Sequence, residues 1–316
     1  MTQSAILTIT LNPALDVSTG TDAVRPEAKL RCDAPVTDPG GGGINVSRAI
    51  KLMGGQSTAF VALGGTTGRR MAEMLEAAGL DWQEMRAPGE TRQSLSVMDR
   101  AIGQQFRFVM PGPEWGSADV GKSVAHILQV AAPDGLIVLS GSNPPGVPAD
   151  YAALLATKLT GTNAGLIVDT SGEALRAAAS GRNGFALLRM NSDEAEDLAG
   201  SPLPGRADTA RFAASLVAAD AAKAVIVARG SDGNIIVTPD GAWHAEAAEV
   251  EVVSKVGAGD SFVAGFTLGL ARNLPHHDAL GLGAAMASAT CMTPATELCR
   301  RADVERLYDA RVITRL

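Results

Sequence analysis

The chain has few aromatic residues and no excess of positive charge, and both features narrow the range of functions. Aromatic residues make up 4% of its 316 residues, so stacking platforms for nucleic-acid bases are scarce. The formal net charge is -7 and the isoelectric point is about 5.2, which argues against nucleic acid or an acidic membrane as the main partner. We therefore expect neither nucleic acid nor a membrane among its partners.

Cysteines are also few, and a long uninterrupted apolar run is absent. The three cysteines, Cys32, Cys291 and Cys299, are far apart and are accompanied by no CxxC pair or histidine cluster. This pattern predicts reduced thiols and no zinc site. The longest uncharged run, ALGLGAAMASATCMTPAT, is broken by Gly, Ser, Thr and Pro, and predicts an internal helix. The N-terminal MTQSAILTITLNP lacks the features of a signal peptide, so we expect a cytoplasmic protein.

What the chain does have is an alternation of short apolar runs with longer helical ones, and 46% hydrophobic residues to build a core. Strands are expected at 6–11, 58–63, 136–140, 166–169, 185–190 and 224–228. Helices are expected at 45–53, 69–79, 120–131, 149–160, 207–221, 260–272, 278–291 and 302–311. Fully apolar strands that alternate with helices predict a parallel sheet covered on both faces, with ligands beyond the carboxyl ends of its strands.

Two segments, about 15–38 and 89–112, interrupt this alternation. Both are polar, alternate in hydrophobicity and lack a helical period. Within the second, SLSVMDRAIGQQFRFVM has the pattern of a hairpin with AIGQ as its turn. We expect the two segments to form a small separate β-sheet inserted into the α/β body, where it can act as a lid.

A cluster of glycines opens a predicted helix in DPGGGGINVSRAI, residues 38–50. The glycines, Gly41 and Gly42 among them, permit positive φ angles and a close approach of the backbone to a ligand, and Asn45 could bond a ligand hydroxyl. The spacing matches neither the P-loop nor the dinucleotide-binding fingerprint. The alternative is a flexible turn in which Asn45 caps the helix.

Polar residues of the inserted segments could bind a sugar phosphate. Asp16 could accept hydrogen bonds from polyol hydroxyls, although an Asp turn is the simpler interpretation. Lys29, Arg31, Arg92 and Arg107 place four cations on the expected lid of an acidic protein, and guanidinium groups suit phosphate oxygens. The alternative for each cation is a solvated strand face that discourages edge pairing.

Two patterns suggest a nucleotide site. In RMNSDEAEDL, Asn191 and Glu194 are three residues apart at a strand end that leads into a helix, and could hold the water shell of Mg²⁺. An N-cap with an acidic first turn explains them equally well. In VARGSDGNIIV, the turn with Arg229, Gly230 and Gly233 could frame a nucleotide phosphate or simply join two strands.

The stretch SKVGAGDSFVAGF, residues 254–266, puts two glycines and Asp260 immediately before an apolar helix. Asp is a good N-cap, which is the structural interpretation. The chemical interpretation is that exposed amides and the helix dipole form an anion site beside an acid that could take a proton from an attacking hydroxyl.

The order of these motifs resembles that of the ribokinase-like (PfkB) carbohydrate kinases over nearly the whole chain. TLNPALD, EAKLRC, PGGGGINVSRAI, TRQSL, FRFVMPG, LSGSNPPGV, VDTSGEAL and VGAGDS occur in the expected order. Within the family, EAKLRC and FRFVMPG look most like the minor-isozyme type of ATP-dependent 6-phosphofructokinase. The resemblance implies one ribokinase-like domain over 1–316, a three-layer α/β/α sandwich with a β-sheet lid, which could also mediate a homodimer.

The resemblance also implies roles for matching residues. Asp260 would be the general base, and the amides of Gly257, Ala258 and Gly259 would hold the transferring phosphoryl group. Sugar hydroxyls would be held by Asp16, Gly41, Gly42 and Asn45. The substrate phosphate would be surrounded by Lys29, Arg31, Arg92, Arg107, Ser140, Gly141 and Ser142, in part from a second subunit. Mg–ATP would lie near Asn191, Glu194, Arg229, Gly230 and Gly233, with Glu194 reaching Mg²⁺ through water.

Three positions depart from the family pattern, all on the nucleotide side. Arg189-Met190-Asn191 stands where relatives commonly have K-P-N, Ala228 where they usually have Ser, and Lys255 where a smaller polar residue is common.

The expected reaction is ATP-dependent phosphorylation of fructose 6-phosphate to fructose 1,6-bisphosphate. The alternative acceptors are tagatose 6-phosphate and fructose 1-phosphate, and the alternative class is a catalytically silent sugar-phosphate sensor.

Overall fold

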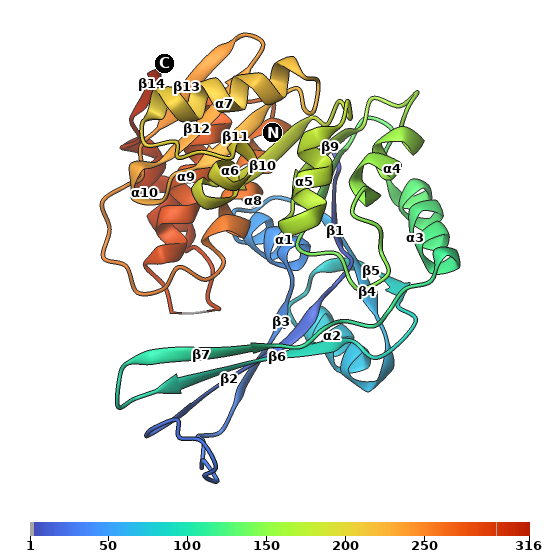
Figure 1. Ribbon diagram of the computed structural model, residues 1–316, viewed down its shortest axis with the longest axis vertical. Coiled ribbons are helices and arrows are strands. Elements are labelled where there is room, and N and C mark those ends of the chain that lie inside the picture. The colour runs from blue at the N-terminus through green and yellow to red at the C-terminus, as the bar shows by residue number, and fades with distance from the viewer. Residues whose placement is uncertain (1–2, 295) are drawn as a thin grey trace.

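The computed structural model describes residues 3–294 and 296–316, and its centre is a ten-stranded sheet (Figure 1). The strands lie in the order β14-β13-β12-β11-β10-β9-β8-β1-β4-β5. Their bounds are β1 Ile6–Thr10, β4 Thr58–Leu63, β5 Asp81–Arg86, β8 Leu136–Ser140, β9 Gly165–Asp169, β10 Leu187–Asn191, β11 Val225–Ala228, β12 Asn234–Thr238, β13 Gly241–Ala245 and β14 Ile313–Arg315. The seven strands from β11 to β5 along this order are parallel, and β12, β13 and β14 pair antiparallel at the other edge.

Helices cover both faces of this sheet. One face carries α1 Gly42–Leu52, α2 Gly65–Ala77, α8 Ala258–Ala271, α9 His276–Cys291 and α10 Arg301–Asp309. The other carries α3 Ser117–Val130, α4 Tyr151–Lys158, α5 Gly172–Ser180, α6 Ser192–Ala199 and α7 Arg206–Ala218. The predicted three-layer α/β/α architecture with a mostly parallel sheet is confirmed.

The alternation of side chains along β4 shows why the sheet needs two helical layers. Ala59 and Val61 pack toward α1 and α2, whereas Phe60 and Ala62 belong to the core on the α3 side. All four side chains are buried. A strand with apolar residues on both faces is stable only when both faces are covered, which is the pattern that the sequence indicates.

The second sheet has the order β3-β2-β6-β7 and projects from the body as a curved ribbon (Figure 1). Its strands are β2 Ala14–Thr21, β3 Val36–Gly40, β6 Arg92–Asp99 and β7 Gln104–Val109. The expected lid from two inserted segments is therefore present. The hairpin is also confirmed, with its connection at residues 100–103 instead of 101–104.

Several elements begin earlier than expected or were not predicted. Helix α1 starts at Gly42 and α8 at Ala258, because glycine at a first turn satisfies helical geometry even though it weakens the sequence signal. The polar strand β5 and the short β14 lack an apolar run, and helix α5 was missed because it is short and buries only Leu175 and Ala178, which gives a weak apolar period. Among the described residues, none of the helices has the length and apolar character needed to cross a bilayer.

Candidate active site

Three neighbouring strands bring a hydroxyl, a carboxylate and a guanidinium together at their carboxyl ends. Ser140 ends β8, Asp169 ends β9, and Arg189 lies near the end of β10; each pairs in register with its neighbour. The Ser140 Oγ donates to Asp169 Oδ2 at 3.1 Å, and Arg189 Nη1 donates to Asp169 Oδ1 at 3.1 Å. Both charged side chains are mostly buried, so this ion pair is a fixed part of the sheet edge.

The glycine-rich loop 40–43 lies against this edge, and the contacts explain the glycines. A Cβ on Gly42 would come within 2.2 Å of Ser140 Oγ, and one on Gly40 within 2.0 Å of Asp16 Oδ2. Gly41 has φ of 139°, which side chains rarely allow. The loop therefore brings the start of α1, Asp16 of the lid sheet and Ser140 to one place.

Asp260 lies in the first turn of α8, which packs against α1. Its Oδ2 accepts a hydrogen bond from Asn45 Nδ2 at 2.8 Å, and no side chain caps the helix, whose N-cap is Gly257. The structure thus rejects the N-cap interpretations of both Asp260 and Asn45. Asn45 is inside α1, a helix that also has no side-chain cap.

The pKa of Asp260 is raised to about 7. Loss of solvent around the carboxyl group is the main cause, and the negative charges of Asp169 and Asp16 add to it. The hydrogen bond from Asn45 and the positive charge of Arg189 act in the opposite direction. A carboxylate with this pKa can accept a proton near neutral pH, which is the requirement for a general base.

The start of α8 offers donors to an anion. Gly257 adopts the left-handed conformation with φ of 77°, and the first-turn amides have no acceptor inside the helix. Of the three amides predicted to bind phosphate, that of Ala258 also donates to the Lys255 carbonyl at 3.3 Å. A Cβ on Gly259 would lie 3.3–3.4 Å from the guanidinium nitrogens of Arg189, so a cation lies beside these amides.

Sequence reasoning missed Arg189 and Asp169 as site residues. Arg189 attracted notice only as a departure from the family pattern, and Asp169 only as part of VDTSGEAL. The available signal was positional, because Asp169 ends an apolar strand and Arg189 lies two residues before the end of another, where a parallel sheet exposes its ligand edge.

A hollow of about 550 Å³ lies between the lid and the body, and Arg92 lines it together with Asn12 and Ser142. Arg92 Nε donates to the Asn12 carbonyl at 3.2 Å and Nη1 to the Met110 carbonyl at 3.3 Å. These bonds hold the guanidinium in place with part of its donor capacity left. Helix α5 also begins at this hollow, where Ser171 and Glu173 line it.

Asp16 belongs to β2, and its negative charge acts on both Asp260 and Arg92. Burial raises the pKa of Asp16, while Arg92, Arg107 and a hydrogen bond from Ser94 oppose that shift. The other predicted lid cations, Lys29 and Arg31, lie in the exposed connection between β2 and β3 and do not line the hollow. Their part in phosphate binding, like that of Arg107, stays a prediction.

On the nucleotide side, Asn191 and Glu194 form a capping box at the start of α6. The Glu194 amide donates to Asn191 Oδ1 at 2.9 Å, and the Asn191 amide donates to Glu194 Oε2 at 2.8 Å. The capping interpretation is therefore realised, with Glu194 Oε1 left to accept a water. Among residues 3–294 and 296–316, no group of three or more His, Cys, Asp or Glu side chains could hold a metal directly.

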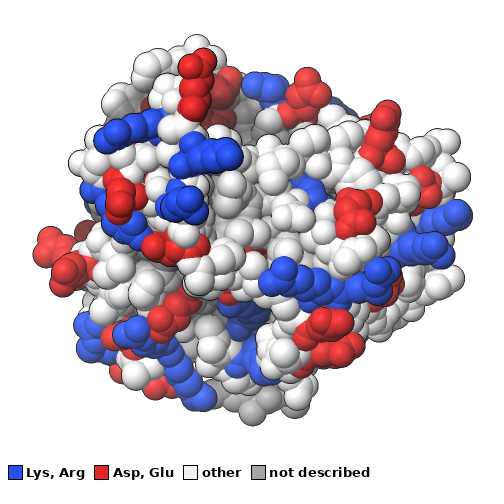
Figure 2. Space-filling view, turned by 90° about the horizontal axis from the view of Figure 1, so that it is seen from below, with Lys and Arg blue, Asp and Glu red and all other residues white. Residues whose placement is uncertain are grey.

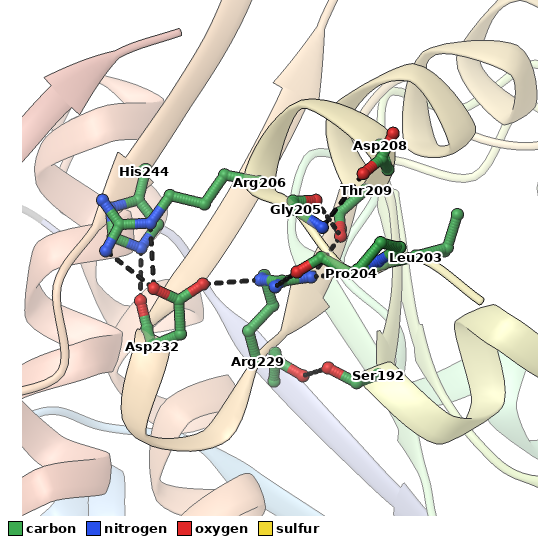
Figure 3. A network of polar contacts seen from close by, with 11 residues as sticks. Ser192, Leu203, Pro204, Gly205, Arg206, Asp208, Thr209, Arg229, Asp232 and His244 are labelled. Atoms are coloured by element: carbon green, nitrogen blue, oxygen red, sulfur yellow. Dashed lines mark hydrogen bonds and ion pairs between the residues drawn. The ribbon is translucent and has the colours of Figure 1, made fainter.

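Arg229 is engaged by its own surroundings (Figure 3). Its Nε donates to Asp232, Nη1 to the Leu203 carbonyl and Nη2 to the Pro204 carbonyl, at 2.7, 3.0 and 3.0 Å. Asp232 also accepts two bonds from Arg206, which lower the pKa of its carboxyl group. These bonds tie the turn after β11 to the start of α7, so a contact of Arg229 with nucleotide stays a prediction.

Backbone conformation and close packing explain the two glycines of this turn. Gly230 and Gly233 have φ of 60° and 98°, and a Cβ on Gly233 would come within 2.1 Å of the Ala245 carbonyl oxygen. They form the connection between β11 and β12, which pair antiparallel. The hairpin interpretation of this stretch is thus confirmed.

An anion cradle beside a partly buried acid, at the carboxyl edge of a parallel sheet under a β-lid, defines a phosphotransferase-type site on an α/β fold. The model of the pfkB family carbohydrate kinases matches residues 1–302, and the chain belongs to this family.

Named relatives agree with this assignment. ATP-dependent 6-phosphofructokinase isozyme 2 of Mycobacterium tuberculosis is 38% identical over 304 residues, 96% of this chain and 89% of the relative. A more distant relative, 1-phosphofructokinase of Bacillus subtilis, is 30% identical over 98% of this chain and 100% of its own length. The structure of phosphofructokinase-2 from Escherichia coli in complex with fructose-6-phosphate superposes with a TM-score of 0.89 at 36% identity, covering 98% of this chain and 99% of that one. The Escherichia coli protein is also known in a tetrameric inhibited form.

Proposed function

We propose that this chain transfers the γ-phosphoryl group of ATP to O1 of fructose 6-phosphate, giving fructose 1,6-bisphosphate, and that residues 1–316 form a single kinase domain. The observation that carries the proposal is the contact between Asn45 and Asp260 at the start of α8, beside the ion pair of Asp169 and Arg189. It places a base beside the first-turn amides of α8. The names of the relatives point to the same reaction.

Asp260 is the base in this proposal. The Asn45 amide aims the carboxylate, and its raised pKa of about 7 makes it a better proton acceptor than an ordinary carboxylate. The O1 hydroxyl passes its proton to an Asp260 carboxylate oxygen as O1 bonds to the γ-phosphorus, and the bond between that phosphorus and the bridging oxygen of ATP breaks, releasing ADP. The Asp16 carboxylate and the loop 40–43 lie where they can hold the other sugar hydroxyls.

The cradle at α8 stabilises the charge on the transferring group. ATP supplies that group, and Mg²⁺ bound to its phosphates neutralises part of their charge. The residues fit these partners: the Gly259 backbone leaves room beside the Arg189 guanidinium, and Glu194 keeps one oxygen for a water of Mg²⁺, which retains several waters. Arg189 and the amides of Gly257 and Gly259 can bond the phosphoryl oxygens.

The lid side would select a phosphorylated acceptor. Arg92 lines the hollow next to Ser142, and the free donors of its guanidinium suit a phosphate group. A neutral sugar would leave this cation in the hollow without a partner.

The test is the initial rate of phosphorylation with ATP–Mg²⁺ across fructose 6-phosphate, tagatose 6-phosphate, fructose 1-phosphate, fructose and ribose. We expect the highest kcat/KM with fructose 6-phosphate. A preference for either other sugar phosphate would keep the role of Arg92 but replace the acceptor. A preference for unphosphorylated sugars would overturn the role of the lid, and no turnover with any sugar would favour the silent sensor.

We also propose a cytoplasmic homodimer that pairs through the lid. Strand β7 is exposed along its whole length, and Phe106, Phe108 and Val109 present apolar surface on it. Figure 2 shows that the face of the molecule seen from below carries charges of both signs, interspersed. The cytoplasm fits the three unpaired cysteines. Sedimentation velocity should give a dimer mass at assay concentration, and a monomer would contradict this proposal.

A further inference from the structure

Arg48 lies one turn after Asn45 on α1 and contacts the side of the Asn45 amide that faces away from Asp260. Its Nη1 donates to Asn45 Oδ1 at 3.3 Å, and its Nη2 to the Thr296 carbonyl at 3.4 Å. The guanidinium is partly buried, and burial lowers its pKa while the charge of Asp38 raises it. Among the ion pairs of the described residues, none involves Arg48.

The hydrogen-bonding chemistry of Arg48, Asn45 and Asp260 determines which way the Asn45 amide faces. An Asn amide has one accepting and one donating end, whereas a guanidinium group can only donate. Arg48 can therefore bond only Oδ1 of Asn45, and this leaves the Nδ2 group for Asp260, where it donates at 2.8 Å. If the amide turned over, Oδ1 would face Asp260 and Nδ2 would face the Arg48 cation.

We propose that Arg48 is a positioning residue for the general base: by holding Oδ1 of Asn45, it keeps the amide donor on Asp260 and the Asp260 carboxylate charged and aimed. This inference rests on the proposed function of Asp260. Arg48 touches neither reacting group and acts only through Asn45. The spacing of three residues on one helix puts the two side chains on the same face.

The other groups that face Asp260 cannot replace this interaction. Asp169 from β9 and Asp16 from β2 repel the charged form, and Arg189 from β10 attracts it but is already paired with Asp169. Among the described side chains, only the Asn45 amide donates a hydrogen bond to the carboxylate. Turning it over would favour the protonated acid, so the pKa of Asp260 would rise further.

The competing explanation is that Arg48 only tethers α1 to the Thr296 carbonyl. A tether would lower stability equally with and without a charge on Asp260. The two roles therefore differ in pH dependence.

The first experiment is the pH profile of kcat/KM for Arg48→Met, with Lys51→Met as the matched control. Lys51 is on the same helix and donates to the Ala78 carbonyl at 2.7 Å, so its removal also deletes a cation from α1 without touching Asn45. We expect Arg48→Met to move the acid limb of the profile up by about one pH unit, the size of one hydrogen bond to a charged group. The rate at pH 6 then falls about tenfold, whereas that at pH 9 changes little. The Lys51→Met profile should keep the wild-type limb.

A cycle with Asn45→Ala separates the amide from the plain loss of charge. On the Asn45→Ala background, Arg48→Met should not move the limb further, because no amide is left to orient. An equal shift on both backgrounds would mean that Arg48 acts on Asp260 by charge alone and would overturn the proposal.

A second readout needs no substrate, so it holds even if the proposed reaction is wrong. Because the pKa of folded Asp260 lies above that of the unfolded chain, stability falls as pH rises toward about 7 and then levels off. We expect Arg48→Met to extend this fall to higher pH in thermal unfolding, and Asp260→Asn to abolish the effect of Arg48→Met on the pH dependence. If Arg48→Met lowers Tm by the same amount at every pH, in both backgrounds, Arg48 is a tether and the proposal fails.

Discussion

The start of α8 and the lid both carry charged residues that the sequence singles out, but they hold them differently. At α8, a hydrogen bond joins Asn45 to Asp260 and an ion pair joins Arg189 to Asp169, and these side chains are partly buried. On the lid, Lys29, Arg31 and Arg107 are exposed, and only Arg92 is anchored, through two carbonyl groups. We infer that the chemistry is built on a preorganised edge, whereas the lid supplies contacts that are completed by substrate or by a second subunit.

The largest effect should come from Asp260→Asn, which keeps the shape of the side chain and removes the proton acceptor. We expect kcat to fall by between about 100-fold and 10,000-fold, the usual range for a general base. Binding of sugar phosphate, measured by calorimetry, should stay within about threefold, because the lid side is untouched. Turnover close to that of the wild type would remove Asp260 from the role of base.

On the lid side, Arg92→Gln should weaken binding of the sugar phosphate acceptor while leaving the proposed base, Asp260, in place. We expect KM for fructose 6-phosphate to rise between about tenfold and 100-fold, the cost of one charge-assisted contact to phosphate. Arg100→Gln is the control, because Arg100 directly follows β6 in the same lid but pairs with Asp22 and Asp33. Equal changes in both variants would show a general loss of positive charge instead of a phosphate contact.

The raised pKa of Asp260 predicts a pH effect that the exposed lid cations do not. Below about pH 7 the acid is protonated and cannot accept a proton, so kcat/KM should fall by about tenfold for each pH unit. Above pH 7 this group imposes no loss. A kcat/KM profile that stays flat down to pH 5 would mean that the surroundings of Asp260 do not desolvate its carboxyl group in solution.

The smallest effect on stability should come from Phe108→Glu on the exposed β7. A surface change of this kind shifts the unfolding free energy of a single chain by about 0.5 kcal/mol or less. The same change should convert the proposed dimer to monomer in sedimentation velocity, because a charge replaces apolar surface. Val312→Glu, exposed near β14 and away from the lid, provides the comparison and should leave the mass unchanged.

Much of the fold was predictable because the apolar strands are short and bounded. The strands at 58–63 and 136–140 have the predicted limits, and the hairpin of the lid was recognised from its alternation. Errors concentrate where the signal is polar or glycine-rich, as in β5 and at the starts of α1 and α8. There, tertiary pairing stabilises a segment whose own composition does not favour it.

For the site, the sequence alone determined the motifs: a glycine cluster that opens a helix, an acid in the GAGD turn, and cations on an inserted sheet. Only the tertiary structure decided that Ser140, Asp169 and Arg189 lie at or near the ends of neighbouring strands, and that Arg48 reaches the far side of the Asn45 amide. Local periodicity reports which face of a strand or helix is buried, because each residue's environment depends on its near neighbours in the chain. Contacts between residues far apart in the chain depend on strand order and helix packing, which become definite only when the whole core is assembled.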